Sequence, residues 1–248
     1  MRSYEEYRRT LELIAAGLDD GSIARTLGIP RRTVSDWRRG RRKSIRPPSE
    51  CRAIHNFAEH ATSSYAYLLG VYLGDGYISR SKQSYVLRVT LDLSYPGIAD
   101  EVANAMAALW PSGNAFRVKR RGGGCVEVCM RSRHWPCLFP QHGPGRKHER
   151  EIRLADWQRG AVDAWPEPFL RGLVQTDGCR FVARDRSGGK VRAYTRYSFS
   201  NRSEDIKALF VETCRRIGVH CTRAGTREIA IARRADVRRL DEFIGPKR

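Results

Sequence analysis

The chain contains the string YLLGVYLGDG at residues 67–76 and a related string, FLRGLVQTDG, at residues 169–178. Each is an apolar run of helical character that ends in Asp-Gly. Gly70 and Gly74 are four residues apart and therefore lie on one helix face, and the second string has Gly and Thr at the matching positions. Small residues at this spacing allow two helix backbones to approach closely. The repeated string predicts two helices that pack on each other about a pseudo-twofold axis.

Asp75 and Asp177 end the two strings, so this packing brings two carboxylates together at one end of the helix pair. A helix C-terminus is the negative end of the helix dipole and disfavours an acid. A second acid nearby raises the electrostatic cost further. A bound divalent cation would relieve both problems, which makes the pair a candidate metal site.

The composition indicates a polyanionic partner. The chain has 248 residues, 41% of them hydrophobic, with 46 Lys plus Arg against 27 Asp plus Glu and a formal net charge of +19. This length suits one large domain or two smaller ones. No apolar stretch is long enough to span a membrane and no signal peptide opens the chain, so we expect a cytoplasmic, nucleoid-associated protein with no membrane partner. Double-stranded DNA is the expected partner, the alternative being a merely basic, ribosome-like protein.

The seven cysteines do not indicate a structural metal site. Their odd number and the lack of a CxxC pair indicate reduced thiols. Several ligand-type residues cluster and raise zinc as an alternative, but their spacing matches no standard zinc finger. No zinc is therefore expected at this cluster, which comprises Cys125, Cys129, His134, Cys137 and His142.

Residues 1–45 have the pattern of a helix-turn-helix. A short helix ends at Gly28, which tolerates a left-handed conformation, and a second helix begins near Arg31. The alternative is a basic helical bundle or a protein-interaction module. Residues 46–62, which open with a Pro-Pro pair, are predicted to be a linker. The candidate DNA contacts on the second helix are Arg31, Arg32, Thr33, Ser35, Arg38 and Arg39.

The rest of the chain has the pattern of an internal duplication, with halves at residues 63–160 and 161–248. Each half ends in a Gly/Pro turn that carries a lysine. Lys147 follows Asp75 by 72 residues and Lys247 follows Asp177 by 70. The expected elements after the first acid are a strand at 85–93, a helix at 98–109 and hairpin strands at 115–120 and 125–131. After the second they are a strand at 195–201, a helix from 203 and hairpin strands at 221–226 and 228–233.

With these two strings and their matched downstream elements, residues 63–248 resemble a two-repeat, single-chain LAGLIDADG homing endonuclease. The resemblance implies an α+β fold, a pseudo-twofold pair of αββαββ(α) repeats with antiparallel DNA-binding sheets, here preceded by the all-α helix-turn-helix domain. It implies a monomer with internal pseudo-dimer symmetry whose sheets form a saddle in the DNA major groove. The residues expected to face outward toward DNA are Arg88, Thr90, Arg117, Lys119, Arg131, Arg196 and Arg233.

The resemblance also implies a chemistry for the repeated strings. Asp75 and Asp177 would bind Mg²⁺, with Mn²⁺ as a possible substitute, and position water for attack on phosphate. The backbone carbonyls of Gly74 and Thr176 would assist as metal ligands.

Three further positions carry roles implied by the resemblance. Lys147 and Lys247 would stabilise charge on the phosphate, one near each site. Asn201, at the end of a hairpin, would hold a water molecule. The aligned position in the first half is Leu93, with Asp92 adjacent. The two active sites are therefore expected to be unequal.

Two functions compete on this sequence. The first is a site-specific double-stranded DNA endonuclease that hydrolyses phosphodiesters with a metal ion. The second is a transcriptional regulator that combines a LAGLIDADG-like domain with a helix-turn-helix and does not cut. Such regulators usually lose the motif acids, whereas this chain keeps both. The intact acids favour the nuclease, and a splicing maturase is a more remote third interpretation.

Overall fold

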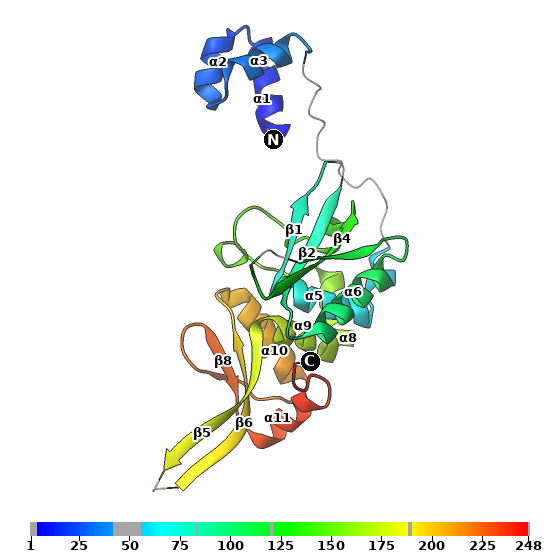
Figure 1. Cartoon of the computed structure of the whole chain (residues 1–248), viewed down its shortest axis with the longest axis vertical. Coiled ribbons are helices and arrows are strands. Elements are labelled where there is room, and N and C mark those ends of the chain that lie inside the picture. Colours follow the sequence, from blue (N-terminus) through cyan, green and yellow to red (C-terminus); the bar gives the residue numbers. More distant parts are fainter. Residues whose placement is uncertain (1–3, 42–55, 83, 120–121, 188–189, 248) are drawn as a thin grey trace. The chain divides into compact units, whose positions relative to one another are not determined.

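A computed structural model describes residues 4–41, 56–82, 84–119, 122–187 and 190–247 (Figure 1). The chain divides into two compact units, residues 1–52 and 53–248. The predicted domain boundary at residue 45 and the first part of the predicted linker lie outside the described residues. Among those described, no helix has both the length and the apolar character needed to cross a membrane.

The N-terminal unit contains three helices, α1 (Tyr4–Ala15), α2 (Asp20–Leu27) and α3 (Arg31–Arg38). The Asp19 side chain caps α2 by accepting two backbone N–H groups, and Gly28 ends the helix with a φ of 60°. Only a residue that tolerates left-handed φ fits there, as the sequence predicted. A small apolar core forms around Ile23, Val34 and Trp37. The three helices therefore enclose a core of their own.

The C-terminal unit contains the same succession of helices and strands twice, as predicted (Figure 1). The first half comprises α5 (Ser63–Leu73), β1 (Gly76–Arg80), β2 (Tyr85–Asp92), α6 (Pro96–Leu109), β3 (Ala115–Lys119), β4 (Cys125–Ser132) and α7 (Trp135–Leu138). The second comprises α9 (Pro166–Asp177), β5 (Gly178–Ser187), β6 (Lys190–Ser200), α10 (Glu204–Arg216), β7 (Thr222–Arg223), β8 (Glu228–Ile231) and α11 (Arg234–Asp241). Outside this repeat lie α4 (Phe57–His60), a 3₁₀ turn (Lys147–Glu149) and α8 (Asp156–Ala164).

Each half folds into a four-stranded antiparallel sheet of identical topology, β1-β2-β4-β3 and β5-β6-β8-β7. One face of each sheet packs on helices. On β2, for example, Leu87, Val89 and Leu91 point into the core while Arg88 and Thr90 point the other way. This alternation is the period of two expected of a strand with one buried face. The sequence placed β2, β3, β4 and β6 but gave no range for β1 or β5, and it made the last hairpin too long, because β8 ends at Ile231 and α11 follows.

Helices α5 and α9 pack directly on each other, as the small residues predicted. A Cβ atom built on Gly70 would lie 2.3 Å from the Phe169 carbonyl oxygen. A Cβ atom built on Gly172 would lie 2.3 Å from the Tyr67 carbonyl oxygen. These reciprocal backbone contacts leave no room for any side chain, and they relate the two halves by a pseudo-twofold axis. The axis brings the C-terminal ends of both helices to one place.

Candidate functional site

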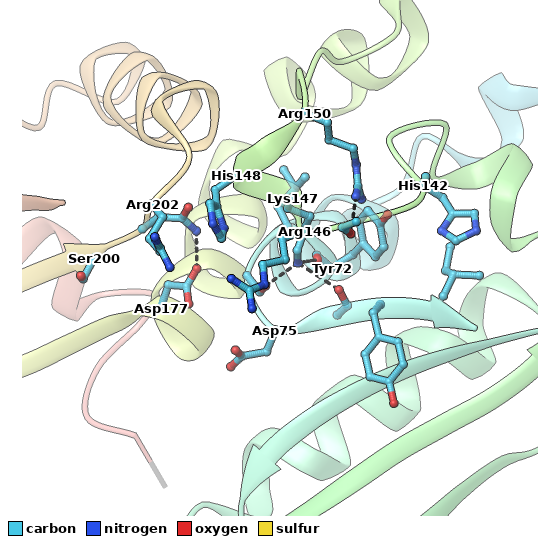
Figure 2. A pocket seen from close by; sticks show the side chains of 18 residues that line it. Tyr72, Asp75, His142, Arg146, Lys147, His148, Arg150, Asp177, Ser200 and Arg202 are labelled. Atoms are coloured by element: carbon cyan, nitrogen blue, oxygen red, sulfur yellow. Dashed lines mark hydrogen bonds between the residues drawn. The ribbon is translucent and has the colours of Figure 1, made fainter. Parts of the chain in front are cut away.

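Both motif acids line one cavity of about 580 Å³ at the C-terminal ends of α5 and α9 (Figure 2). Asp75 follows the last turn of α5 and Asp177 is the last residue of α9. Lys147 and Asn201 line the same cavity, so four of the predicted site residues come together from four segments. The lining also contains His142, which the sequence weighed only as part of a zinc cluster, and four residues that the sequence did not single out, Arg146, His148, Arg150 and Arg202.

The two acids perturb each other. Burial, followed by the nearby Asp75 carboxylate, raises the pKa of Asp177 to about 6. Burial also raises the pKa of Asp75, and the charges of Lys147 and Lys247 oppose that rise. Asp177 is half-buried, and Asp75 is the more exposed of the two. Two carboxylates at the negative ends of two helix dipoles are the unfavourable arrangement expected from the sequence. The same carboxylates and helix dipoles would attract a cation bound between the two acids.

Lys147 places a positive charge close enough to both acids to lower their pKa values. Its Nζ donates hydrogen bonds to the backbone carbonyls of Tyr72 (2.5 Å), Gly74 and Gly76 (2.9 Å). These carbonyls belong to the end of α5 and the start of β1, where the helix leaves C=O groups without N–H partners. Burial lowers the pKa of the Lys147 ammonium to about 8, against the charges of Asp177 and Asp75. The lysine therefore supplies the local counter-charge to the acids.

Lys247 occupies the related position in the second half. Its Nζ lies 3.5 Å from the Thr176 carbonyl oxygen, the counterpart of Gly74 O. Burial lowers its pKa, and the neighbouring Cys179, Asp75 and Asp177 oppose this. The similar placement explains why the two lysines follow their acids by nearly equal numbers of residues.

The chain end that carries Lys247 is anchored to strands and helix α9 of the second half. Arg180 on β5 makes a bidentate pair with Asp241 at the end of α11 (2.7 and 3.0 Å), and the Tyr197 hydroxyl donates to the same carboxylate (2.7 Å). Arg171 on α9 donates to the Phe243 carbonyl. The sequence interpretation missed these anchors, because the pairing of Arg180 with an acid 61 residues away leaves no local pattern.

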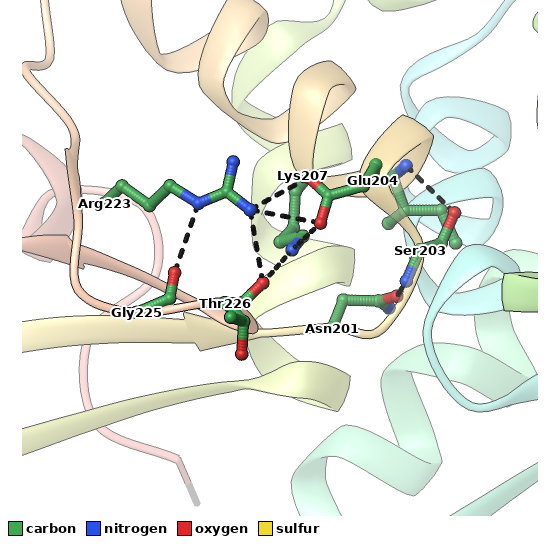
Figure 3. Close-up of polar contacts among 8 residues, drawn as sticks. Asn201, Ser203, Glu204, Lys207, Arg223, Gly225 and Thr226 are labelled. Atoms are coloured by element: carbon green, nitrogen blue, oxygen red, sulfur yellow. Dashed lines mark hydrogen bonds and ion pairs between the residues drawn. The ribbon is translucent and has the colours of Figure 1, made fainter.

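Asn201 is fixed against the second acid. Its Nδ2 donates to Asp177 Oδ2 at 2.6 Å, and its Oδ1 accepts the Ser203 backbone N–H at 2.7 Å. The buried Lys207 lies next to this turn, and its Nζ donates hydrogen bonds to Glu204 Oε1 (2.6 Å) and to the Thr226 carbonyl (Figure 3). The Asn201 amide is thus oriented by backbone on one side and presents its N–H to the acid on the other.

Asp92 takes the corresponding turn in the first half. Its Oδ1 accepts the Ser94 backbone N–H at 2.8 Å, the same two-residue pattern as in Asn201. This hydrogen bond, with a smaller contribution from Lys247, lowers the pKa of Asp92. The backbone supports Leu93 as the counterpart of Asn201, because the Leu93 N–H donates to the Gly124 carbonyl (2.8 Å) as the Asn201 N–H donates to the Arg227 carbonyl (3.0 Å). The Leu93 side chain is apolar and 42% exposed, so the polar group of this turn is the adjacent Asp92.

The donor set around the two acids fits a hard cation. It consists of two carboxylates and the backbone carbonyls of Gly74 and Thr176, all oxygen donors of the kind that Mg²⁺ and Ca²⁺ prefer. Gly74 also lies against Thr176, since a Cβ on Gly74 would be 2.0 Å from Thr176 Oγ1 and 3.4 Å from Asp177 Oδ2. Within the described ranges, no three His, Cys, Asp or Glu side chains gather to hold a metal. A cation here would therefore depend on the acid pair and the carbonyls.

Four of the seven predicted outward residues lie on the helix-free faces of the sheets. Arg88 and Thr90 alternate with the core residues of β2, and Arg131 lies on the same face of β4, with its guanidinium 5.8 Å from the Phe116 ring centre. Arg196 lies on the helix-free face of β6, with its guanidinium 5.6 Å from the Tyr194 ring centre. Arg88 differs from the others because it pairs with Glu127.

Three of the predicted outward residues point elsewhere. Arg117 and Lys119 pair in register with Val128 and Val126, which are core residues, so both lie on the helix side of edge strand β3. Arg117 forms an ion pair with Asp100 of α6. Arg233 precedes the first residue of α11 and belongs to no strand. The sequence placed these strands but could not give the pleat phase of a short edge strand or the early end of β8.

Helix α3 exposes only part of its predicted contact set. Arg31, Arg32 and Arg39 are exposed, and Ser35 is half-buried on the same face as Arg31 and Arg39. Thr33 is buried. Arg38 turns back to bond Asp20 (2.7 Å) and the Leu18 carbonyl (2.5 Å). The inward placement of Thr33 follows from its position beside the core residue Val34, and Arg38 is bound by an acid that the helical pattern of α3 alone does not reveal.

No protein-family model matches the chain, and no curated protein matches it in sequence. Among solved structures, the crystal structure of I-DmoI in complex with DNA and Mn has a TM-score of 0.50 at 17% identity, over 77% of this chain and 98% of that one. The fold is that of a LAGLIDADG endonuclease. The LAGLIDADG meganuclease I-AabMI bound to uncleaved DNA has a TM-score of 0.45 at 13% identity, over 72% of this chain and 82% of that one. Full-length DUF199/WhiA from Thermatoga maritima has a TM-score of 0.47 at 16% identity, over 79% of this chain and 59% of that one.

Proposed function

We propose that the protein is a sequence-specific, metal-dependent endonuclease that acts on double-stranded DNA as a monomer with two related halves. The observation that carries this proposal is the acid pair. Asp75 and Asp177 share one cavity, and burial together with mutual repulsion raises the pKa of Asp177 to about 6. A protein that only bound DNA would gain nothing from two acids that repel each other and also repel phosphate.

The remaining residues have roles that follow from their contacts. A divalent ion such as Mg²⁺, held by Asp75, Asp177 and the carbonyls of Gly74 and Thr176, would supply Lewis-acid stabilisation of the phosphate and a deprotonated water. Lys147 and Lys247 are close enough to both acids to stabilise negative charge that develops on the phosphate. Asn201 holds Asp177 in one orientation and is placed to orient a water molecule.

DNA as the partner is supported by charge and by the relative with the same fold. The chain carries a formal net charge of +19, and I-DmoI is described in complex with DNA and Mn. A protein with this excess of cations gains affinity for DNA through counterion release. The helix-free faces of the two sheets, with Arg88, Arg131 and Arg196, are the surfaces we assign to the duplex.

The experiment is binding-site selection from a random duplex library, followed by cleavage of the selected site in Mg²⁺. The wild type is expected to cleave it, and the Asp75→Asn/Asp177→Asn variant is expected to bind it without cleavage. The same pair of proteins reports on the metal, because Mg²⁺ should raise the melting temperature of the wild type and not that of the variant. Loss of binding together with cleavage in the variant would show that the acids act in folding rather than in catalysis.

A transcriptional regulator is the second candidate. The observation that favours it is the N-terminal unit, where α3 exposes Arg31 and Arg39 on one face with Ser35 between them. Such a helix suits entry into a major groove. Tight binding of the selected site by the wild type, with no cleavage in either Mg²⁺ or Mn²⁺, is the result that this second function predicts.

A further inference from the structure

Glu127 is a buried acid on the surface that the proposed function places against DNA. It lies on β4, opposite Thr90 of β2 and Val118 of β3, on the helix-free face of the first sheet. Its relative exposure is only 4%. A carboxylate on a phosphate-facing surface is unfavourable unless its charge is neutralised. The groups that it contacts therefore decide its role.

One partner of Glu127 is Arg88, whose guanidinium is held at two of its three nitrogen atoms. Arg88 Nη1 lies 3.1 Å from Glu127 Oε2, and Arg88 Nε donates to Ser79 Oγ at 3.0 Å. The Tyr77 hydroxyl lies 3.2 Å from the other carboxylate oxygen. Arg88 Nη1 also lies 3.6 Å from Cys129 Sγ. The guanidinium is planar, so contacts at Nε and Nη1 fix the direction of Nη2.

Neutralisation and fixed orientation suit Arg88 to contact a base rather than a phosphate. Together with Glu127 it carries no net charge, and it therefore adds little to the non-specific attraction for phosphate. Its Nη2 has no partner among the described residues, and its side chain is 28% exposed. An oriented Nη2 donor suits a guanine, whose O6 and N7 acceptors in the major groove are the commonest target of arginine in specific protein–DNA contacts.

Arg196, on the helix-free face of the second sheet, has no such partner. It forms no ion pair with any carboxylate in the described part of the chain, and its Nε is buried without a hydrogen bond. The acid on that face, Glu228, accepts instead from Ser198 Oγ at 2.6 Å. Arg196 therefore keeps its net charge, whereas the charge of Arg88 is cancelled.

We propose that Glu127 determines specificity, because it holds Arg88 as a neutral, oriented donor that reads one guanine in the half-site bound by β1–β4. Arg196 contributes mainly charge toward phosphate in the other half-site. This inference rests on the proposed DNA binding but not on cleavage, so it applies to the nuclease and the regulator alike.

The test is site selection and binding with Glu127→Gln, which keeps an acceptor for Tyr77 and removes the charge. We expect preference for guanine at one position of one half-site to fall by roughly 5-fold or more. The dependence of log Kobs on log salt is expected to steepen by up to about 0.9, because Arg88 becomes a net cation. Glu228→Gln is the matched control and should leave both quantities unchanged at that position.

Two further variants complete the test. Arg88→Met/Glu127→Gln removes both charges of the pair, so it should abolish the preference at that same position, by roughly 5- to 150-fold, with little change in salt slope. Arg196→Met should reduce the slope by about 0.9 and weaken all sequences alike. The inference is overturned if Glu127→Gln selects the same site with unchanged discrimination, or if the double variant behaves like Arg196→Met. A wild type that selects no sequence would instead refute the proposed DNA binding, and melting curves separate all these results from loss of the fold.

Discussion

At the scale of single residues, the site contains ionisable side chains in surroundings that disfavour their charged forms. Asp75 and Asp177 are acids at negative helix ends, and burial together with their proximity raises the pKa of Asp177 to about 6. Lys147 is a buried ammonium whose pKa is lowered to about 8. Such paired perturbations are typical of functional sites, although ion-pair networks also produce them. Here they coincide with a cavity and a shared donor set.

Asp177→Asn is expected to stabilise the metal-free protein at neutral pH. The folded-state pKa of about 6 lies above the unfolded value of 3.8, so the folded state binds the proton more tightly. Stability therefore falls as pH rises from about 4 to 6 and stays lower above that. Removal of the charge should recover about 1–3 kcal/mol of unfolding free energy at pH 7.5. Denaturant unfolding in the presence of a chelator measures this gain.

The same variant provides its own control through pH. Near pH 3 both states of the wild type are largely protonated at this position, so the gain should disappear. A variant that is equally stable or less stable than the wild type at pH 7.5, or a gain that persists unchanged at pH 3, would contradict the assignment of a half-buried carboxylate with a raised pKa.

The residue scale also shows where sequence patterns are sufficient. The acids, their lysines and Asn201 were found because a duplicated chain repeats its spacing, and the structure brings them to one cavity or its border. Glu127, Arg180 and Asp241 were not found, since each acts through a partner on another element and carries no local motif. The sequence aligned Leu93 with Asn201, as the matching backbone hydrogen bonds of the two turns support, but it did not show that Asp92 accepts the Ser94 N–H beside it.

At the scale of elements, the α5–α9 interface is the structural centre of the C-terminal unit. Gly70 and Gly172 each face the backbone of the opposite helix at distances that no side chain tolerates. Their spacing predicted this contact because helix periodicity fixes which residues share a face. The edge strand β3 was less predictable, since a strand of five residues can be pleated in either phase and its neighbours decide which.

Gly70→Ala is expected to lower the free energy of unfolding by about 1–3 kcal/mol or more, because the new methyl group meets backbone atoms that cannot rotate away. Thermal or urea unfolding measures this loss. Gly160→Ala is the matched control, because Gly160 lies inside α8 with open space around it. That change should stabilise by up to about 1 kcal/mol through helix propensity. Equal effects of the two substitutions would show that α5 and α9 do not pack as described.

At the scale of the whole molecule, positive charge is present in both units, and both are assigned to DNA. In the N-terminal unit the exposed charges on α3 are Arg31, Arg32 and Arg39, whereas Arg38 is engaged by Asp20. The sequence predicted the helices but not that Arg38 is engaged while Arg31, Arg32 and Arg39 are available, because the partner of Arg38 belongs to a different helix. The contribution of Arg31 and Arg39 to DNA binding in solution therefore tests the role of the N-terminal unit.

Arg31→Met/Arg39→Met in the full chain should make the plot of log Kobs against log salt less steep by about 2, since two phosphate contacts are lost. The control is Arg8→Met/Arg9→Met, which removes the same charge from the exposed face of α1, where both residues pair with Glu12. That control is expected to leave the slope nearly unchanged. Equal slopes for both double variants would remove α3 from the DNA interface.

The central claim is that the two acids form a catalytic pair on the pseudo-twofold axis. The most direct measurement uses a selected site labelled on each strand in turn, incubated with the wild type and Mg²⁺ and analysed under denaturing conditions. The account predicts a discrete cut in both strands within the bound site, and no cut in either strand for the Asp75→Asn/Asp177→Asn variant that still binds. A wild type that protects the site and leaves both strands intact, in Mg²⁺ and in Mn²⁺, would contradict it.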